Sequence, residues 1–139
     1  MNRLALLLLL AGCSSGTAPW SQSVVDLPYH AEEVVKAVAA LPECDAVRQG
    51  GVIRWRDSTL TCGGVQGVSG CAHPFETPPL VEVVMRGDAW DGPPSKVDPK
   101  VAISSLAHEL CHVCGYTDGP DAEAQADSCA MRARLMAGK

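Results

Sequence analysis

His108-Glu109-Leu110-Cys111-His112 is the most informative stretch of the chain. It is an HExxH pentapeptide, with its two histidines four residues apart. On an α-helix, residues four apart lie on one face, so His108 and His112 can present two imidazole nitrogens to one metal ion. Glu109 lies about 100° round such a helix, beside the open position of that metal. The stretch therefore predicts a helix that carries a metal site.

The residues around the motif have the apolar period of an amphipathic helix. Ile103, Leu106, Leu110 and Val113 follow one another at spacings of 3, 4 and 3 residues, which places them on one stripe. The stripe lies on the side opposite the two histidines, so one face can pack while the other binds. We expect this helix to cover residues 101–115.

One candidate for a third metal ligand is Asp118. It completes an HExxHxxGxxD pattern that is similar to the metzincin peptidases of the snapalysin type, with Asp in place of a third His. The segment Asp118-Gly119-Pro120 is also a turn signal, which gives Asp118 an ordinary structural role. A metzincin should in addition have a methionine-containing turn below the metal, whereas Met131 and Met136 fall within an expected helix.

The second candidate is Glu123, in the segment EAQAD at residues 123–127. This ExxAD element resembles that of the gluzincin branch of the zincin metallopeptidases, which includes membrane-associated peptidases and the ImmA/IrrE-like group. The match runs from the HExxH motif to about Met136. It implies Glu123 as third ligand and Asp127 as the acid that orients a ligating histidine. We favour Glu123, because two acids four residues apart repel each other unless a cation or an imidazole lies between them.

The N-terminus has the pattern of a bacterial lipoprotein signal peptide. Arg3 precedes the apolar run Leu4 to Leu10, which is far shorter than the roughly 20 residues that span a bilayer. The segment Leu10-Ala11-Gly12-Cys13 resembles a lipobox, which implies that Cys13 becomes the acylated first residue. Ser14, rather than Asp, after that cysteine implies sorting to the outer membrane, facing the periplasm or the exterior.

These features divide the chain into three parts. We expect a signal peptide over residues 1–12, a lipidated flexible tether rich in Ser, Gly, Thr and Pro over 13–28, and one domain over 29–139. Loss of Arg3 leaves 10 basic against 16 acidic residues, a net charge of -6. This acidity argues against a nucleic-acid partner and against electrostatic binding to anionic lipid. We therefore expect the acyl chains of Cys13 to attach the protein to the lipid bilayer.

Six cysteines remain after the lipobox: Cys44, Cys62, Cys71, Cys111, Cys114 and Cys129. An even number in an exported chain indicates disulfides. Cys62 and Cys71 bound a glycine-rich loop that can close as a hairpin, so we expect this pair. Cys129 can join the last helix to the motif helix through Cys111 or Cys114. A metal-binding or redox-active Cys111-x-x-Cys114 is the less favoured alternative, because the oxidising compartment favours pairing.

The rest of the pattern indicates the α+β class. An apolar stripe followed by Pro42 predicts an N-terminal helix, and two runs rich in β-branched residues predict strands. The expected elements are a helix over 30–41, strands over 51–56 and 80–86, a loop over 87–99, and helices over 101–115 and 121–137. Their order resembles a small zincin-like domain with a short, mostly antiparallel sheet, in which an edge strand lines the cleft above the HExxH helix.

The resemblance implies zinc-dependent hydrolysis of peptide bonds. Three protein ligands would leave one zinc position for a water molecule and lower the pKa of that water towards ~7. Glu109 would be the catalytic base that takes the proton and passes it to the leaving amine. Tyr116 and His73 are candidates for the oxyanion donor. The strand over 80–86 is a candidate for pairing with an extended peptide or protein substrate.

Two other classes of function remain as alternatives. A catalytically inactive lipoprotein would keep zinc as a staple for a structural or binding module. Glu109 argues against this class, because a structural zinc site fills its fourth position with a protein ligand and needs no base. A metzincin-like protease that uses Asp118 is the other alternative.

Overall fold

The computed structural model describes residues 20–22, 31–56, 58–84 and 99–138. The signal peptide expected over 1–12, the lipidation site Cys13 and most of the expected tether lie outside these residues, as do residues 87–98 of the expected loop. Within the described part of the chain, no helix is long and apolar enough to cross a membrane.

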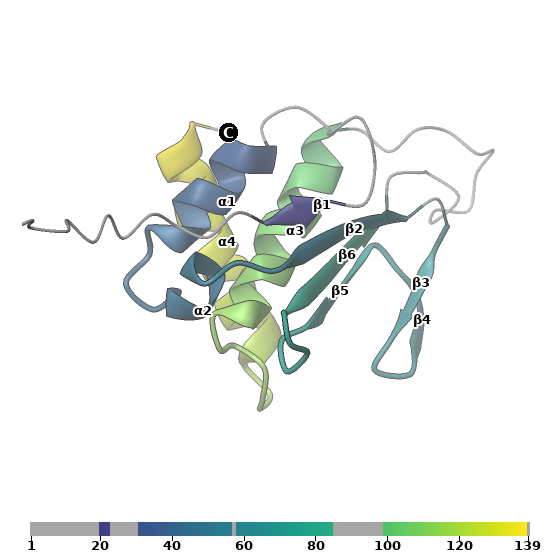
Figure 1. Ribbon diagram of the computed structural model, residues 1–139. Helices are drawn as coiled ribbons and strands as arrows, with labels where there is room; N and C mark the ends of the chain where they lie inside the picture. Colours follow the sequence, from purple (N-terminus) through teal and green to yellow (C-terminus); the bar gives the residue numbers. More distant parts are fainter. Residues whose placement is uncertain (1–19, 23–30, 57, 85–98, 139) are drawn as a thin grey trace, which may run out of the picture.

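The described residues form an α+β domain, the class expected from the sequence (Figure 1). Three helices confirm expected ones to within two residues at each end, whereas the short helix α2 was not expected. The helices are α1 (Ala31–Ala39), α2 (Asp45–Arg48), α3 (Pro99–Val113) and α4 (Ala122–Ala137).

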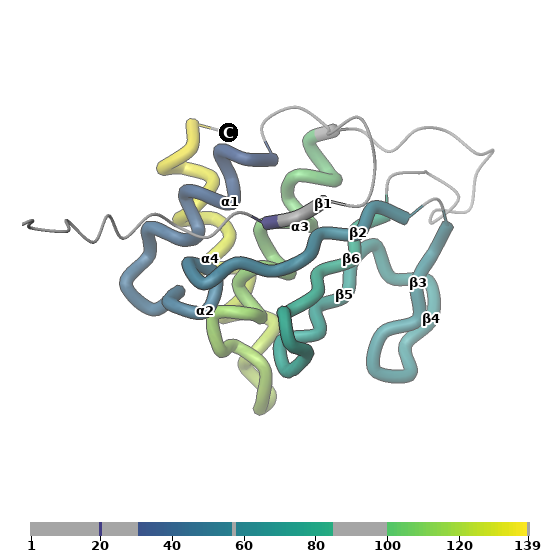
Figure 2. Tube along the Cα trace, in the orientation of Figure 1, coloured from purple at the N-terminus to yellow at the C-terminus, as the bar shows by residue number. Residues whose placement is uncertain are grey.

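A four-stranded sheet covers one side of the helices. Its strands, in the spatial order β1-β2-β6-β5, are β1 (Ser21–Gln22), β2 (Val52–Arg56), β6 (Leu80–Val84) and β5 (Gly70–His73). The pairings β1–β2 and β2–β6 are parallel, while β5–β6 is antiparallel. The strands β3 (Leu60–Cys62) and β4 (Val65–Val68) form a separate antiparallel hairpin, which projects beyond the sheet (Figure 2). Antiparallel pairing, expected to dominate, accounts for two of these four pairings.

The strand at the cleft edge of the sheet is β5. Residues 80–86 were a candidate for the strand that pairs with a substrate, but β6 lies between β2 and β5 and has no edge free for pairing, so this candidate is wrong. His73, a candidate for the oxyanion donor, is the last residue of β5. The run Gly70-Cys71-Ala72-His73 has little strand character by itself, and its pairing with β6 supplies the missing stability.

Trp20 belongs to the folded domain. Its side chain is only 8% exposed, and the indole N–H donates to the carbonyl oxygen of Val47 at 2.9 Å. A Cβ at Gly51 would approach the indole ring to 2.5 Å, which shows how closely the two pack. The expected tether over 13–28 is therefore wrong at residues 20–22. Burial of a large aromatic ring outweighs the polar composition around it.

Helix α3 lies between the sheet and the helices α1 and α4, and it contacts both sides (Figure 1). Its predicted apolar stripe is confirmed, since Ile103, Leu106, Leu110 and Val113 are all buried in the main core. With this stripe in the core, the face that carries the HExxH histidines is turned towards the molecular surface. Packing of the stripe thus fixes the orientation of the candidate site.

Three disulfides fasten this arrangement: Cys44–Cys114, Cys62–Cys71 and Cys111–Cys129. The expected Cys62–Cys71 pair is confirmed, and Cys111 is the partner of Cys129. The alternative of a metal-binding or redox-active Cys111-x-x-Cys114 is wrong, because the sulfurs of Cys111 and Cys114 are both bonded to cysteines elsewhere in the chain. The bond from Cys111 joins α3 to α4 directly.

Candidate metal centre

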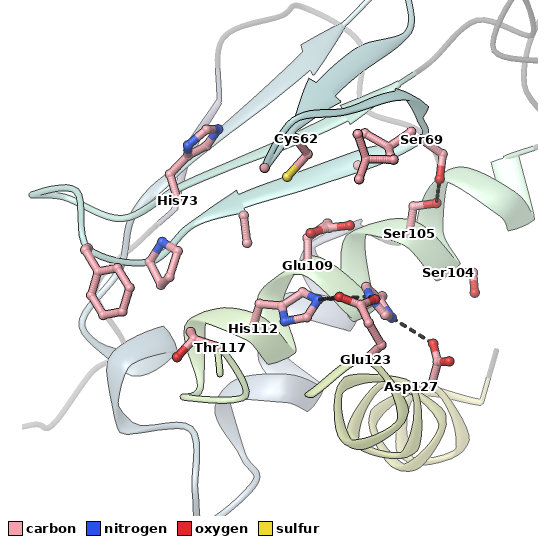
Figure 3. A pocket seen from close by; sticks show the side chains of 18 of the residues that line it. Cys62, Ser69, His73, Ser104, Ser105, Glu109, His112, Thr117, Glu123 and Asp127 are labelled. Atoms are coloured by element: carbon pink, nitrogen blue, oxygen red, sulfur yellow. Dashed lines mark hydrogen bonds and ion pairs between the residues drawn. The ribbon is translucent and has the colours of Figure 1, made fainter. Parts of the chain in front are cut away.

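Two helices supply the side chains of the site. His108 and His112 lie one turn apart on α3, and the chain then reverses through two glycines with positive φ, Gly115 at 121° and Gly119 at 93°. Glycine adopts these conformations without steric cost. The reversal lets α4 run back past α3, so that Glu123 and the acid one turn later face the histidines (Figure 3).

Three donor groups converge at one point. The Nε2 atoms of His108 and His112 are 3.0 Å apart, and the carboxylate of Glu123 lies 3.1 Å from the first and 3.4 Å from the second. Tetrahedral zinc with bonds of 2.0–2.1 Å holds its ligand atoms about 3.3 Å apart. The geometry of His108, His112 and Glu123 therefore fits a metal ion of this size and coordination.

The outer nitrogen of each ring is committed to a hydrogen bond. His108 Nδ1 donates to Asp127 Oδ1 at 2.7 Å, and His112 Nδ1 donates to the backbone carbonyl of Tyr116 at 2.5 Å. A carboxylate or carbonyl oxygen only accepts, so the hydrogen of each neutral ring is on Nδ1. Both Nε2 atoms then present lone pairs towards the centre of the site.

This assignment leaves acceptors facing acceptors. Two imidazole lone pairs and a carboxylate at these distances repel one another unless a cation lies between them. The side chain of Glu123 is largely exposed to solvent, and its carboxylate lies beside the rings through its contacts with the two Nε2 atoms. Two histidines and one glutamate in this arrangement can bind a metal ion.

Glu109 lies beside these donors but is buried. It is 8% exposed, and it accepts a hydrogen bond from the backbone N–H of Ala72 on β5. Burial raises the pKa of Glu109 to about 7, against a lowering effect of His108 and with a further raising effect of Glu123. A carboxyl with this pKa can both accept and give up a proton near neutral pH.

An open cleft of about 1240 Å³ surrounds the site (Figure 3). The cleft is lined by β5, by the β3–β4 hairpin and by α3 and α4. Val65 on the hairpin and Phe75 after β5 expose most of their apolar surface there. Among the described residues that line it, none is Lys or Arg, whereas Glu76 and Asp127 add negative charge. The cleft thus offers apolar and acidic walls around the donor group.

Three further sequence candidates lie in different places. Asp118 is exposed, accepts a hydrogen bond from Thr117, and is not part of the donor group. The hydroxyl of Tyr116 donates to Glu43 at 3.1 Å, so an oxyanion role for this hydroxyl does not fit the structure. Tyr116 contributes to the site through its backbone carbonyl, which accepts the hydrogen bond from His112 Nδ1. His73 lines the cleft, and its ring nitrogen Nε2 is hydrogen-bonded to Glu82 Oε2 at 3.0 Å.

The sequence analysis missed several residues of the site. Ser105 lines the cleft three residues before His108, a spacing that helical periodicity would have identified. Gly70 and Ala72, which contact Glu109, come from a strand that the sequence pattern did not predict. No local signal marks them, because their role depends on the packing of β5 over α3.

Comparisons of the chain with family models, with curated proteins and with solved structures found no match.

Proposed function

We propose that this protein is a zinc-dependent peptidase in which His108, His112 and Glu123 hold the metal ion. The observation that carries the proposal is the convergence of these three donors beside the buried Glu109 in an open cleft. Two imidazoles and one carboxylate suit zinc, and three protein ligands leave one position free, as catalytic zinc sites do. The resemblance to gluzincins supports the same ligand set.

The chain's own residues have distinct tasks in such a reaction. When bound, zinc would activate a water molecule and polarise the scissile carbonyl. From its position beside the donor group, the carboxylate of Glu109 would accept the proton of the water and pass it to the leaving nitrogen. Asp127 and the Tyr116 carbonyl keep the histidine rings in the ligating tautomer.

The edge strand β5 offers the substrate a backbone to pair with. Val84 N–H donates to the carbonyl of Ser69, and pairing of β5 with β6 continues in the same register. Because hydrogen-bonding direction alternates along an antiparallel strand, Gly70 and Ala72 direct their N–H and C=O groups away from β6. The N–H of Ala72 donates to Glu109, so an extended peptide would add to this edge through the groups of Gly70 and the carbonyl of Ala72, and pass the metal centre.

The lipobox resemblance supports a location in the bacterial cell envelope. Acylation of Cys13 would attach the domain to a bilayer, with the outer membrane as the expected destination. Peptides or proteins of that compartment are then the proposed substrates. The exposed side chains of Val65 and Phe75 favour substrates with apolar residues near the cleaved bond.

Metal analysis and peptide-library cleavage test the proposal. The protein should begin at Ser14, because a later start risks removing the buried Trp20. We expect one zinc ion per chain and cleavage within peptides. Glu109→Gln should retain the zinc and lower turnover by a factor on the order of 10² or more, since the base is lost while the ligands stay. A zinc-free protein, or unchanged turnover in this variant, contradicts the proposal.

A further inference from the structure

Gly70 lies directly against the side chain of Glu109. A Cβ at Gly70 would come within 2.5 Å of Glu109 Oε1, 2.7 Å of its Cγ and 2.9 Å of its Cδ. These separations are far shorter than the roughly 3.5–4.0 Å at which carbon atoms pack. Any larger residue at this position would therefore displace the whole carboxyl arm of Glu109, and not only its tip.

The backbone of Gly70 does not itself require glycine. Seven glycines of the described chain have positive φ, but Gly70 is not among them. It is the first residue of β5, paired with Val83, and glycine in a strand is less stable than alanine because it loses more conformational freedom on folding. The space taken by Glu109 is the feature of the structure that explains a glycine here.

Ala72 completes the same contact. Residues two apart on a strand lie on one face, so Gly70 and Ala72 both approach α3. Gly70 provides the room for the carboxyl arm of Glu109, and the outward N–H of Ala72 provides a hydrogen-bond donor to its carboxylate. Glu109 is thus enclosed between β5 and its own helix.

We propose that Gly70 is a positioning residue, whose missing side chain lets the carboxyl of Glu109 seat under the edge strand. The catalytic part of this inference rests on the proposed function, in which Glu109 is the base. This role depends on the absence of a side chain at Gly70, and not on the backbone groups that would pair with a substrate. Gly70 acts by fixing where the proton acceptor stands relative to the zinc site.

The kinetic test uses Gly70→Ala in the zinc-loaded protein. We expect it to keep one zinc per chain and a KM within about twofold of wild type, while kcat falls at least tenfold, because displacement of a positioned base lowers the chemical step. Gly51→Ala is the matched control. The Cβ it adds beside the same sheet meets Trp20 and not Glu109, so it should destabilise the fold and leave kcat of the folded protein within about twofold.

A double-mutant cycle tests the contact between Gly70 and the side chain of Glu109 without any substrate. Gly70→Ala should lower the midpoint of urea unfolding in the wild-type background. In a Glu109→Ala background it should leave the midpoint unchanged or raise it, because the crowding is gone and alanine is the more stable strand residue. Equal downward shifts in both backgrounds would overturn the inference, and so would a Gly70→Ala variant with wild-type kcat.

The two proposals fail in different ways. A zinc-loaded wild-type protein without peptidase activity would overturn the proposed function, and with it the catalytic meaning of Gly70. The unfolding cycle would still decide whether Gly70 makes room for Glu109, because it needs neither zinc nor substrate.

Discussion

The ring hydrogens of His108 and His112 determine what the centre of the site can bind. Each hydrogen is held on Nδ1 by an oxygen that only accepts, Asp127 Oδ1 for one ring and the Tyr116 carbonyl for the other. The lone pairs on Nε2 are therefore aimed at a common point before a metal ion arrives. Such orientation lowers the cost of forming the complex, because the rings need not reorganise.

Asp127→Ala tests this orientation. We expect zinc affinity to fall about 10- to 100-fold, the loss typical of an acid that holds a ligand without touching the metal. Competition with a zinc chelator measures the loss. Asp121→Ala, which removes an exposed acid just before the same helix, is the control and should leave affinity unchanged. A loss in Asp127→Ala as large as that in Glu123→Ala would mean that Asp127 is itself a ligand.

Among the elements, α4 carries Glu123 and the acid that orients His108, and it is held beside α3 by packing, by hydrogen bonds such as that from Arg134 to Ser104, and by one disulfide. Cys111, buried within α3 between the two histidines of the motif, is bonded to Cys129 on α4. A disulfide limits the separation of the two helices even when side-chain packing fluctuates. The position of the third donor thus depends on a buried bond that does not line the cleft.

Removal of this disulfide should weaken the metal site. We expect the double variant Cys111→Ala, Cys129→Ala to lose about 2–5 kcal/mol of stability and also zinc affinity, since α4 can then move relative to α3. Thermal unfolding and chelator competition measure the two effects. The double variant Cys62→Ala, Cys71→Ala is the control: it frees the hairpin but no ligand, so zinc affinity should stay near wild type. Equal loss of affinity in both would contradict this role of the disulfide.

The helices of the site were predictable because their signals are local. The apolar stripe of α3 and the HExxH spacing fall within fifteen residues, so period alone places the histidines opposite the core. The position of β6 inside the sheet was not predictable, because it depends on strands distant in the sequence. The same holds for Tyr116, whose hydroxyl is taken by Glu43, 73 residues away.

At the scale of the whole molecule, the domain begins earlier than its composition suggests. Trp20 is buried and β1 extends the sheet, so only a short segment separates the lipobox cysteine from the fold. Under the proposed lipidation, the domain would lie close to the bilayer that anchors it. Access of substrates to the cleft would then depend on how the domain stands relative to that surface.

Cys13→Ala tests the anchor. We expect the variant to lose acylation and to leave the membrane fraction, while its thermal unfolding midpoint stays at the wild-type value, because no described core residue precedes Trp20. Fractionation of cells and metabolic labelling with a fatty acid measure these properties. Retention of label in the variant would exclude Cys13 as the acylated residue.

His108, His112 and Glu123 are the three proposed ligands of the metal ion. The most direct test measures zinc per chain, after challenge with a chelator, in wild type, Glu123→Ala and Asp118→Ala. We predict one zinc in wild type and in Asp118→Ala, and loss of zinc in Glu123→Ala, because two histidines alone hold zinc weakly. Zinc lost in Asp118→Ala and retained in Glu123→Ala would contradict the account and assign the third ligand to Asp118.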